Sequence, residues 1–206
     1  MFLNSYKYAG FTLIELMVTV AVLAILMTLA VPSFQAMVAS NISATQANEL
    51  VVALNKARIE AIKKHRSVVM CASENQIICN SGNGAVIAAD KNNWEKGWII
   101  QLLSEENSSC TAATCTYIQQ KISSAGSNTI KSINFINFAT GRIVFDRMGN
   151  VSNPGGTFVV CDYRGATEAR AVIVSITGYT KVNEIKTGGA LADVVNDNVG
   201  ADVTCP

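Results

Sequence analysis

A single carboxylate interrupts the most apolar stretch of the chain. Within residues 11–31, Glu15 is the one side chain that can ionise. An ionisable group inside an apolar helix is costly, so it normally has a partner. If the chain were cut after Gly10, the new amine of Phe11 would stand four residues before Glu15 on the same helix face. The pair could form within one subunit or between neighbours in a bundle of such helices. The alternative is a glutamate that snorkels to lipid headgroups.

Six cysteines form the second set of reactive side chains. They allow fifteen disulfide connectivities in an oxidising compartment. Their spacings match no zinc site built from close ligand pairs, and His65 is the single histidine of the chain. We therefore expect disulfides, and we expect no metal and no cofactor. The cysteines are Cys71, Cys79, Cys110, Cys115, Cys161 and Cys205.

Patterns typical of enzymes find little support in this sequence. Gly82-Asn83-Gly84 lacks the Lys-Ser/Thr of a phosphate-binding loop. The adjacent carboxylates of Glu105 and Glu106 would diverge on any regular element. Nothing near His65 supports a pair with a nucleophile. The sequence therefore predicts no catalytic residues, and we expect that the protein is not an enzyme.

The element that must position Glu15 is a long apolar helix. Hydrophobic residues make up 50% of the 206 residues and charged residues 15%, which is more apolar than a soluble domain of this size. As a helix, residues 11–31 would extend about 31 Å, enough to span a bilayer core. Lys7 precedes this stretch and the next cation is Lys56, so the N-terminus is expected in the cytoplasm. The exported remainder can then form disulfides.

Beyond Pro32 the pattern changes from continuously apolar to amphipathic. Apolar residues recur at helical spacing, which predicts one buried stripe on a helix that covers residues 11–65 in all. The last turns of this helix carry five cations against Glu60, which suits the helix macrodipole. A ligand-binding patch at that end is the alternative. The stripe consists of Leu50, Leu54, Ala57 and Ala61.

Residues 67–206 have the composition of one β-rich domain. Short runs of β-branched and aromatic residues alternate with turn signals that contain glycine. We expect an antiparallel sheet, or two, over the amphipathic half of the long helix. The predicted strands are residues 67–71, 97–101, 133–138, 142–145, 157–161 and 170–176, and the turn signals are residues 82–84, 149–150 and 154–156.

Two tryptophans and three glycines have structural interpretations. We interpret Trp94 and Trp98 as core and loop-covering residues rather than as a platform for a ligand. Gly97, Gly149 and Gly178 fit positions in turns or bulges. None of these residues therefore requires a binding site.

The start of the chain resembles the processing motif of type IV prepilins. The motif is Gly10-Phe11-Thr12-Leu13-Ile14-Glu15. The resemblance implies cleavage after Gly10, methylation of Phe11 and an assembly role for Glu15. Pro32 matches a proline that type IVa pilins commonly carry, where it kinks or locally melts the helix. The implied parts are a leader at 1–10, a transmembrane and filament-core helix at 11–34, its amphipathic second half at 35–66, and a periplasmic β-rich head with a C-terminal tail at 67–206.

The rest of the chain resembles the FimT/GspH family of minor pilins and minor pseudopilins. The order of segments carries this resemblance: a strand with Cys71, then residues 94–99, then residues 143–151, and a late strand at 171–175 that runs into Thr177-Gly178. The fold that it implies is the α+β type IV pilin-like fold, in which a long N-terminal α-helix packs against an antiparallel β-sheet head.

The family resemblance also implies a function. We expect a minor pilin that joins a type IV pilus and primes or caps its assembly. Its partners would be other major and minor pilins, a prepilin peptidase and the inner-membrane assembly platform. It would cross the bacterial inner membrane once, with a periplasmic head, before assembly into a pilus (fimbrium) on the cell surface. The alternative is a minor pseudopilin of a type II secretion system that acts in protein export.

Sequence proximity and the resemblance together suggest how the cysteines pair. Many type IV pilins hold their C-terminal segment to the sheet with a disulfide. We therefore expect the pairs Cys71–Cys79, Cys110–Cys115 and Cys161–Cys205, with no free thiol. The last pair would hold residues 183–206, which are weakly periodic and would otherwise fray.

DNA is a further possible partner, suggested by charge and by a partial resemblance. The whole chain has a formal charge of +1, so charge-driven binding requires a local patch. FimT-like pilins that serve DNA uptake carry Gly-Arg-x-Arg at the end of the late strand, where this chain has Gly178-Tyr179-Thr180-Lys181. Lysine can contact phosphate, and tyrosine can stack on an unpaired base. The alternative is a solvated strand end. The candidate DNA-binding residues are Lys181, Tyr179, Lys186, Arg142 and Arg170.

Overall fold

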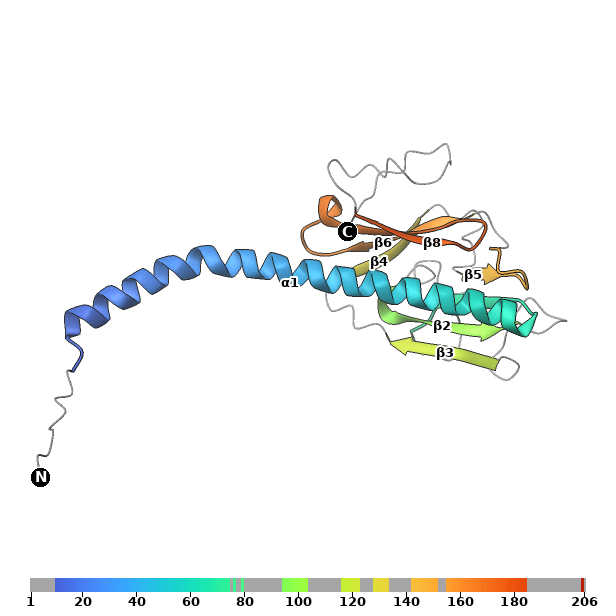
Figure 1. Ribbon diagram of the computed structural model, residues 1–206, viewed down its shortest axis with the longest axis horizontal. Coiled ribbons are helices and arrows are strands. Elements are labelled where there is room, and N and C mark those ends of the chain that lie inside the picture. The colour runs from blue at the N-terminus through green and yellow to red at the C-terminus, as the bar shows by residue number, and fades with distance from the viewer. Residues whose placement is uncertain are drawn as a thin grey trace, which may run out of the picture. The chain divides into compact units, whose positions relative to one another are not determined.

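The computed structural model describes residues 10–74, 76, 79, 94–103, 116–122, 128–133, 142–151, 155–184 and 205. The chain divides into two compact units, Met1–Ala39 and Ser40–Pro206. Helix α1 (Leu13–Lys64) contributes residues to both units (Figure 1). Each unit therefore contains one part of the same helix.

Helix α1 begins at Leu13 rather than at Phe11, because Thr12 caps it. The Oγ1 atom of Thr12 accepts a hydrogen bond from the backbone N–H of Glu15 at 3.3 Å. The Thr12 carbonyl accepts the bond from the N–H of Leu16 at 3.2 Å. Threonine followed three residues later by glutamate is the sequence pattern of a capping box. The cap places Glu15 in the first helical turn, where the positive end of the macrodipole favours a carboxylate.

The other end of α1 is closed by a left-handed residue. The φ angle of His65 is 51°. The N–H of His65 donates to the carbonyl of Ile62, and the N–H of Arg66 donates to the carbonyl of Ala61, both at 3.3 Å. These two bonds define a Schellman motif, which ends the helix at Lys64. His65 is exposed at this helix end, so its role here is conformational.

Up to residue 35, α1 is a continuous helix of exposed side chains. Every residue from 10 to 35 is exposed. The helix continues through Pro32, so the local melting suggested by the family resemblance is absent from this helix. Proline removes one backbone donor from the helix, and the remaining turns hold the helical conformation around it.

The second unit contains, among its described residues, two four-stranded antiparallel sheets (Figure 1). The strand order is β3-β2-β1-β5 in the first sheet and β4-β6-β7-β8 in the second. The strands are β1 (Val68–Ala72), β2 (Gly97–Leu102), β3 (Thr116–Ile122), β4 (Thr129–Ile133), β5 (Arg142–Phe145), β6 (Gly156–Cys161), β7 (Arg170–Val174) and β8 (Thr180–Glu184), with short 3-10 helices η2 (Trp94–Lys96) and η4 (Ala166–Glu168).

The predicted strands at 67–71, 97–101, 142–145, 157–161 and 170–176 are confirmed as β1, β2, β5, β6 and β7, with small shifts at their ends. Of the predicted strand at 133–138, only Ile133 lies among the described residues, at the end of β4. Three strands, β3, β4 and β8, were not predicted. Each lies at an edge of its sheet, where a strand is hydrogen-bonded on one side and needs less apolar character.

The core of the second unit joins the helix to both sheets. The predicted stripe is confirmed, since Leu50, Leu54, Ala57 and Ala61 are fully buried in one apolar cluster with strand residues. Trp94 and Trp98 are also fully buried in this cluster, so both are core residues and neither is only a loop cover. The Trp94 ring meets that of Phe158 edge to face, with centroids 4.8 Å apart. Gly149 and Gly178 have positive φ angles in turns, as predicted, and Gly97 has a positive φ angle at the first residue of β2.

Candidate functional site

The predicted processing segment lies at the start of α1 and is open to solvent. Gly10 and Phe11 precede the helix, and Phe11 is 80% exposed. Within 4 Å of a Cβ built on Gly10 there are no neighbouring heavy atoms. The scissile bond expected after Gly10 is therefore free of steric protection by the described part of the chain. Glu15 follows in the first helical turn and is exposed as well.

The helix behind this segment has the length and composition of a membrane span. Helix Leu13–Lys64 contains an apolar segment that is long enough to cross a membrane, and none of this segment is buried within the described structure. Its hydroxyls bond within the helix: Thr19 donates to the carbonyl of Leu16 at 2.9 Å, and Thr28 to that of Ile25 at 2.7 Å. A segment in hydrocarbon must satisfy its polar groups internally in this way.

Two disulfides connect parts of the second unit. Cys71 is bonded to Cys79, with Cα atoms 5.5 Å apart, and Cys161 to Cys205, with Cα atoms 5.8 Å apart. These are the pairings that proximity and the family resemblance suggested. No described cysteine is free. The third expected pair, Cys110–Cys115, lies outside the described residues.

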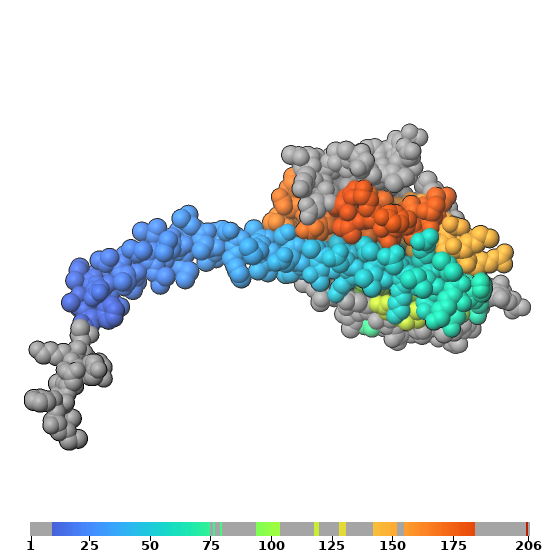
Figure 2. Space-filling view, viewed as in Figure 1, coloured from blue at the N-terminus to red at the C-terminus, as the bar shows by residue number. Residues whose placement is uncertain are grey.

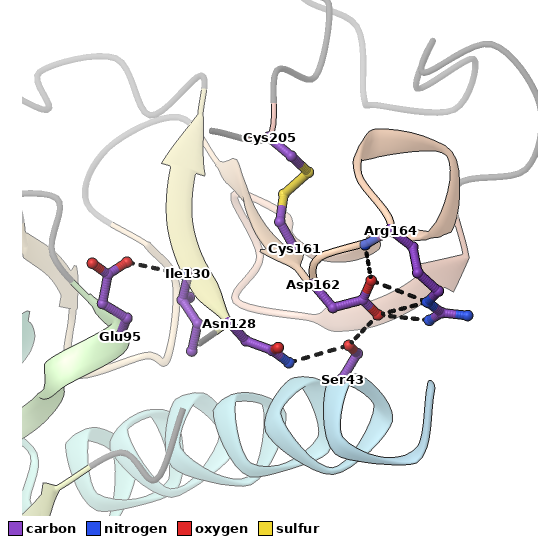
Figure 3. The surroundings of a disulfide bond; sticks show 8 residues. All are labelled: Ser43, Glu95, Asn128, Ile130, Cys161, Asp162, Arg164 and Cys205. Atoms are coloured by element: carbon purple, nitrogen blue, oxygen red, sulfur yellow. Dashed lines mark hydrogen bonds and ion pairs between the residues drawn. A yellow bond between two sulfur atoms is a disulfide. The ribbon is translucent and has the colours of Figure 1, made fainter. Parts of the chain in front are cut away.

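Next to the second disulfide lies a buried ion pair (Figure 3). Asp162 follows Cys161, and its side chain is fully buried. The guanidinium of Arg164 reaches it in a fork, with Nη2 2.6 Å and Nε 3.2 Å from Oδ2, and the Arg164 backbone N–H donates to Oδ1 at 2.9 Å. Burial acts to raise the pKa of Asp162, but the bonds from Arg164 and Ser43 outweigh it, so this pKa lies below its usual value.

The same aspartate holds helix α1 against the second sheet (Figure 3). The hydroxyl of Ser43 donates to Oδ2 of Asp162 at 3.0 Å. The amide of Asn128, just before β4, donates to Oγ of Ser43 at 3.3 Å and to Oε1 of Gln46 at 2.9 Å. All four side chains are buried. We call Ser43, Gln46, Asn128, Asp162 and Arg164 the polar cluster. Sequence reasoning missed it, because its members lie far apart in the chain.

The residues proposed for DNA binding do not form one cluster. Tyr179 and Lys181 share the β7–β8 hairpin, and both are exposed. Arg170 begins β7, about 13 Å along the strand from the end that meets this hairpin turn, and its Nη2 donates to Oγ of Ser40 at 3.4 Å. Arg142 begins β5, in the other sheet. Lys186 lies outside the described residues.

Enzyme-like sites remain without structural support. In the described ranges, no group of three or more His, Cys, Asp or Glu side chains could hold a metal ion. Residues 82–84, Glu105 and Glu106 lie outside the described residues.

Comparisons with known proteins agree with this arrangement. The family model described as type II transport protein GspH matches residues 46–178, and the model of the prokaryotic N-terminal methylation motif matches residues 6–31. No curated protein sequence matches the chain.

Two crystal forms of the type IV minor pilin FimU from Pseudomonas aeruginosa (strain PAO1) have a similar fold. The P21 form is 23% identical, with a TM-score of 0.51, and the match covers 69% of this chain and 89% of that chain. The P65 form is 21% identical, with a TM-score of 0.48, and the match covers 68% of this chain and 90% of that chain. The α+β fold of type IV pilins, predicted from the sequence, is therefore confirmed.

Proposed function

The chain belongs to the GspH family, whose members with pilin architecture are minor pilins or minor pseudopilins, and we propose that it is a minor pilin of a type IV pilus. Its relatives by family and fold are structural subunits rather than enzymes. The protein would act by joining a filament and by priming or capping its assembly, and no bond chemistry of its own is required.

The observation that carries this proposal is the exposed apolar half of α1 behind an open processing segment. Residues 10–35 are exposed throughout, although most of them are apolar. Such a segment is stable in a bilayer or among other apolar helices, and unstable in water. An inner-membrane precursor with a single span, later extracted into a filament core, uses both environments.

The processing motif supplies the chemistry of assembly in this proposal. A prepilin peptidase would cut after Gly10 and leave Phe11 as the methylated N-terminus. The amine of one subunit would then neutralise Glu15 of its neighbour within the apolar core. The carboxylate of Glu15 has no ion pair within the described chain, so it is available to a partner outside it. The assembly platform of the inner membrane and the major and minor pilins would complete the set of partners.

A minor pseudopilin of a type II secretion system is the second candidate. The description of the matching family as a type II transport protein favours it. The cysteine-rich second unit, with a C-terminal segment held by Cys161–Cys205, favours a filament exposed outside the cell, where mechanical load and proteases act. We therefore give preference to the pilus.

A gene deletion, complemented with the wild-type chain, separates the two candidates. Strains are scored in parallel for surface pili in sheared fractions and for secreted enzymes in the medium. We expect the deletion to lower piliation and to leave secretion unchanged. Normal piliation with retained exoproteins inside the cell would instead assign the chain to the secretion system.

DNA binding in natural transformation is an additional role that the β7–β8 hairpin supports. Tyr179 is 63% exposed, and Lys181 is exposed beside it without an ion pair in the described structure. Thr180 points toward α1, where its hydroxyl donates to Asn55 at 3.0 Å. Because side chains alternate along a strand, Lys181 lies on the opposite face of the sheet, away from α1.

Gel retardation with the full-length protein in detergent tests this role. We expect weak binding of double-stranded DNA that falls steeply with salt, and a lower salt slope for Lys181→Ala. Lys96→Ala is the matched control, because Lys96 already pairs with Glu74. Equal retardation by the wild type and by Lys181→Ala would remove DNA binding from this hairpin.

A further inference from the structure

The C-terminal end of α1 and two turns of the sheets carry exposed apolar side chains that none of these roles uses, although the second turn also contains Tyr179. Arg58 on α1 is bonded to the first turn, residues 146–150, because its Nε donates to the carbonyl of Gly149 at 3.1 Å. The N–H of Val151 donates to the carbonyl of Ile176 at 2.8 Å, in the turn of residues 175–179. Figure 2 shows the end of α1 in teal beside the yellow-orange segment that contains the first turn.

Two glycines fix these turns tightly against the helix. Gly149 and Gly178 have φ angles of 83° and 73°, which side-chain-bearing residues rarely adopt. A Cβ on Gly149 would lie 2.7 Å from Cδ1 of Ile62, and one on Gly178 would collide with the carbonyl oxygen of Gly149. The close approach of both turns to the helix makes the surface rigid, and a rigid surface loses little entropy when it binds.

Large apolar side chains are exposed on this surface. Met148 and Ile176 lie in the two turns with 70% and 61% of their surface exposed. On α1, Ile62, which contacts the turn at Gly149, is 42% exposed, and Ile59, three residues earlier on the helix, is 59% exposed. Isolated exposed apolar residues are ordinary, but neighbouring ones mark interaction sites. We call Met148, Ile176, Ile59 and Ile62, together with Arg58, the Arg58 platform.

The edge of the platform is positively charged. Lys56, Lys63 and Arg147 are exposed, and none of them forms an ion pair within the described residues. Glu60 and Asp146, which are near these cations in the sequence, are half-buried. One of these acids, Asp146, is held in its own turn, where Oδ1 accepts the N–H groups of Met148 and Asn150 at 2.8 and 2.9 Å. Cations without an ion pair among the described residues therefore adjoin these apolar side chains, Lys63 next to Ile62 and Arg147 next to Met148.

We propose that the Arg58 platform binds an acidic protein surface with an apolar centre on the neighbouring subunit of the filament. The inference rests on the proposed function, which supplies a neighbouring subunit. An apolar centre that excludes water inside a charged rim is the usual composition of a protein interface. The cations select a partner of opposite charge and speed its approach. Nucleic acid is a poorer match, because the aliphatic side chains of Met148 and Ile176 neither stack on bases nor contact phosphate.

The test compares filament incorporation by full-length variants produced in the deletion strain. The first variant is Met148→Ser with Ile176→Ser, and the second is Lys63→Glu with Arg147→Glu. The matched control is Tyr163→Ser, because Tyr163 is 66% exposed in the β6–β7 connection, outside the platform. The readout is the chain present in sheared filaments, divided by the processed chain in the membrane. Thermal unfolding in detergent verifies that each variant folds.

We expect both platform variants to lose about tenfold or more in incorporation, which corresponds to about 1.4 kcal/mol, while the control stays within about twofold. The purified wild type should also bind the major pilin of the same filament in detergent, more weakly as salt rises.

Absence of the wild type from all filaments would refute the proposed function itself. Normal incorporation of both platform variants beside an incorporated wild type would overturn only the platform. Platform variants that lose DNA retardation but assemble normally would assign the surface to nucleic acid, and would also overturn the proposal.

Discussion

The two halves of helix α1 differ in whether the chain itself buries their apolar side chains. Residues 10–35 are exposed throughout and apolar on every side. In the second half, burial returns every three or four residues, at Ala47, Leu50, Leu54, Ala57 and Ala61. A stripe can be covered by the chain's own sheets, whereas a helix that is apolar all round cannot. The chain itself therefore covers the apolar stripe of the second half, whereas it leaves the apolar side chains of residues 10–35 exposed.

Polar side chains follow the same division. In the first half, Thr19 and Thr28 bond to carbonyls of their own helix. In the second half, Ser43 bonds to Asp162 and Asn55 to Thr180, both on the second sheet or its connections. Bonds within the helix suit an environment without water, and bonds across elements fix a tertiary structure. Glu15 belongs to neither pattern, which is consistent with a partner on another subunit.

Gly10→Val should have the largest effect, and it should act on the first half alone. We expect complete loss of cleavage, because a β-branched side chain restricts both the backbone and the space at the scissile bond. The fold should be unaffected, since a Cβ at Gly10 meets no neighbour. Mass spectrometry of the N-terminal peptide and thermal unfolding in detergent measure the two outcomes. Gly10→Ala is the mild control, and a mature chain that starts anywhere but Phe11 would contradict the assignment.

Glu15→Ala should impair assembly without harming insertion. Removal of the carboxylate favours the apolar environment, but it leaves a neighbour's amine unpaired in the filament core, at a cost of about 3 kcal/mol. We expect about a hundredfold loss from sheared filaments, with a normal amount of processed chain in the membrane. Thr19→Ala, whose hydroxyl bonds only within the helix, is the control. Equal incorporation of the Glu15 variant and this control would refute the pairing.

Leu54→Ala and Leu23→Ala make the comparison between the halves direct. Leu54 is fully buried in the core of the second unit, whereas Leu23 is 52% exposed in the first. We expect Leu54→Ala to lower the free energy of unfolding by about 3 kcal/mol and Leu23→Ala to leave it within about 0.5 kcal/mol. Thermal or denaturant unfolding of the full-length protein in detergent measures both. Similar losses would mean that the first half packs on the chain itself.

Periodicity explains which features could be predicted from the sequence. The stripe of Leu50, Leu54, Ala57 and Ala61 follows the helical period, and strands such as β6 are continuous apolar runs. Strand β8, with the sequence TKVNE, has one large apolar residue. It forms because β7 supplies its hydrogen bonds from one side, which no local pattern records.

Two other features were missed for different reasons. The cap at Thr12 has a local signal, Thr-x-x-Glu, which places the helix start at Leu13 and not at Phe11. The polar cluster has no local signal at all. Ser43 and Asp162 are 119 residues apart in the chain, and only the packing of α1 on the second sheet brings them together. The candidate processing site could therefore be predicted, whereas the contacts that hold the second half of α1 could not.

Asp162→Asn should have the smallest effect of the four, and it tests how the second half of α1 is held. The variant loses the charge-assisted bonds from Arg164 and Ser43, and it leaves the guanidinium of Arg164 without its carboxylate. Because the Arg164 side chain is 18% exposed, water compensates part of this loss. We expect the free energy of unfolding at pH 7 to fall by about 2 kcal/mol. Ser43→Ala should cost about 1 kcal/mol, since it removes one of these bonds and no charge.

The pH dependence of the stability lost in Asp162→Asn shows whether the contact of Asp162 depends on its charge or only on its polarity. The pKa of Asp162 in the folded protein lies below its value in the unfolded chain, which is about 3.9. The ionised form therefore stabilises the fold fully above pH 4, and this contribution disappears as the pH falls through the lower, folded pKa. The difference in unfolding free energy between wild type and Asp162→Asn should be constant from pH 7 to about pH 5 and should shrink below pH 4. Ser43→Ala, which keeps the carboxylate and its pair with Arg164, should retain most of the acid sensitivity of the wild type. A difference between wild type and Asp162→Asn that stays constant down to pH 2 would show that the charge of Asp162 does not hold α1 to the sheet.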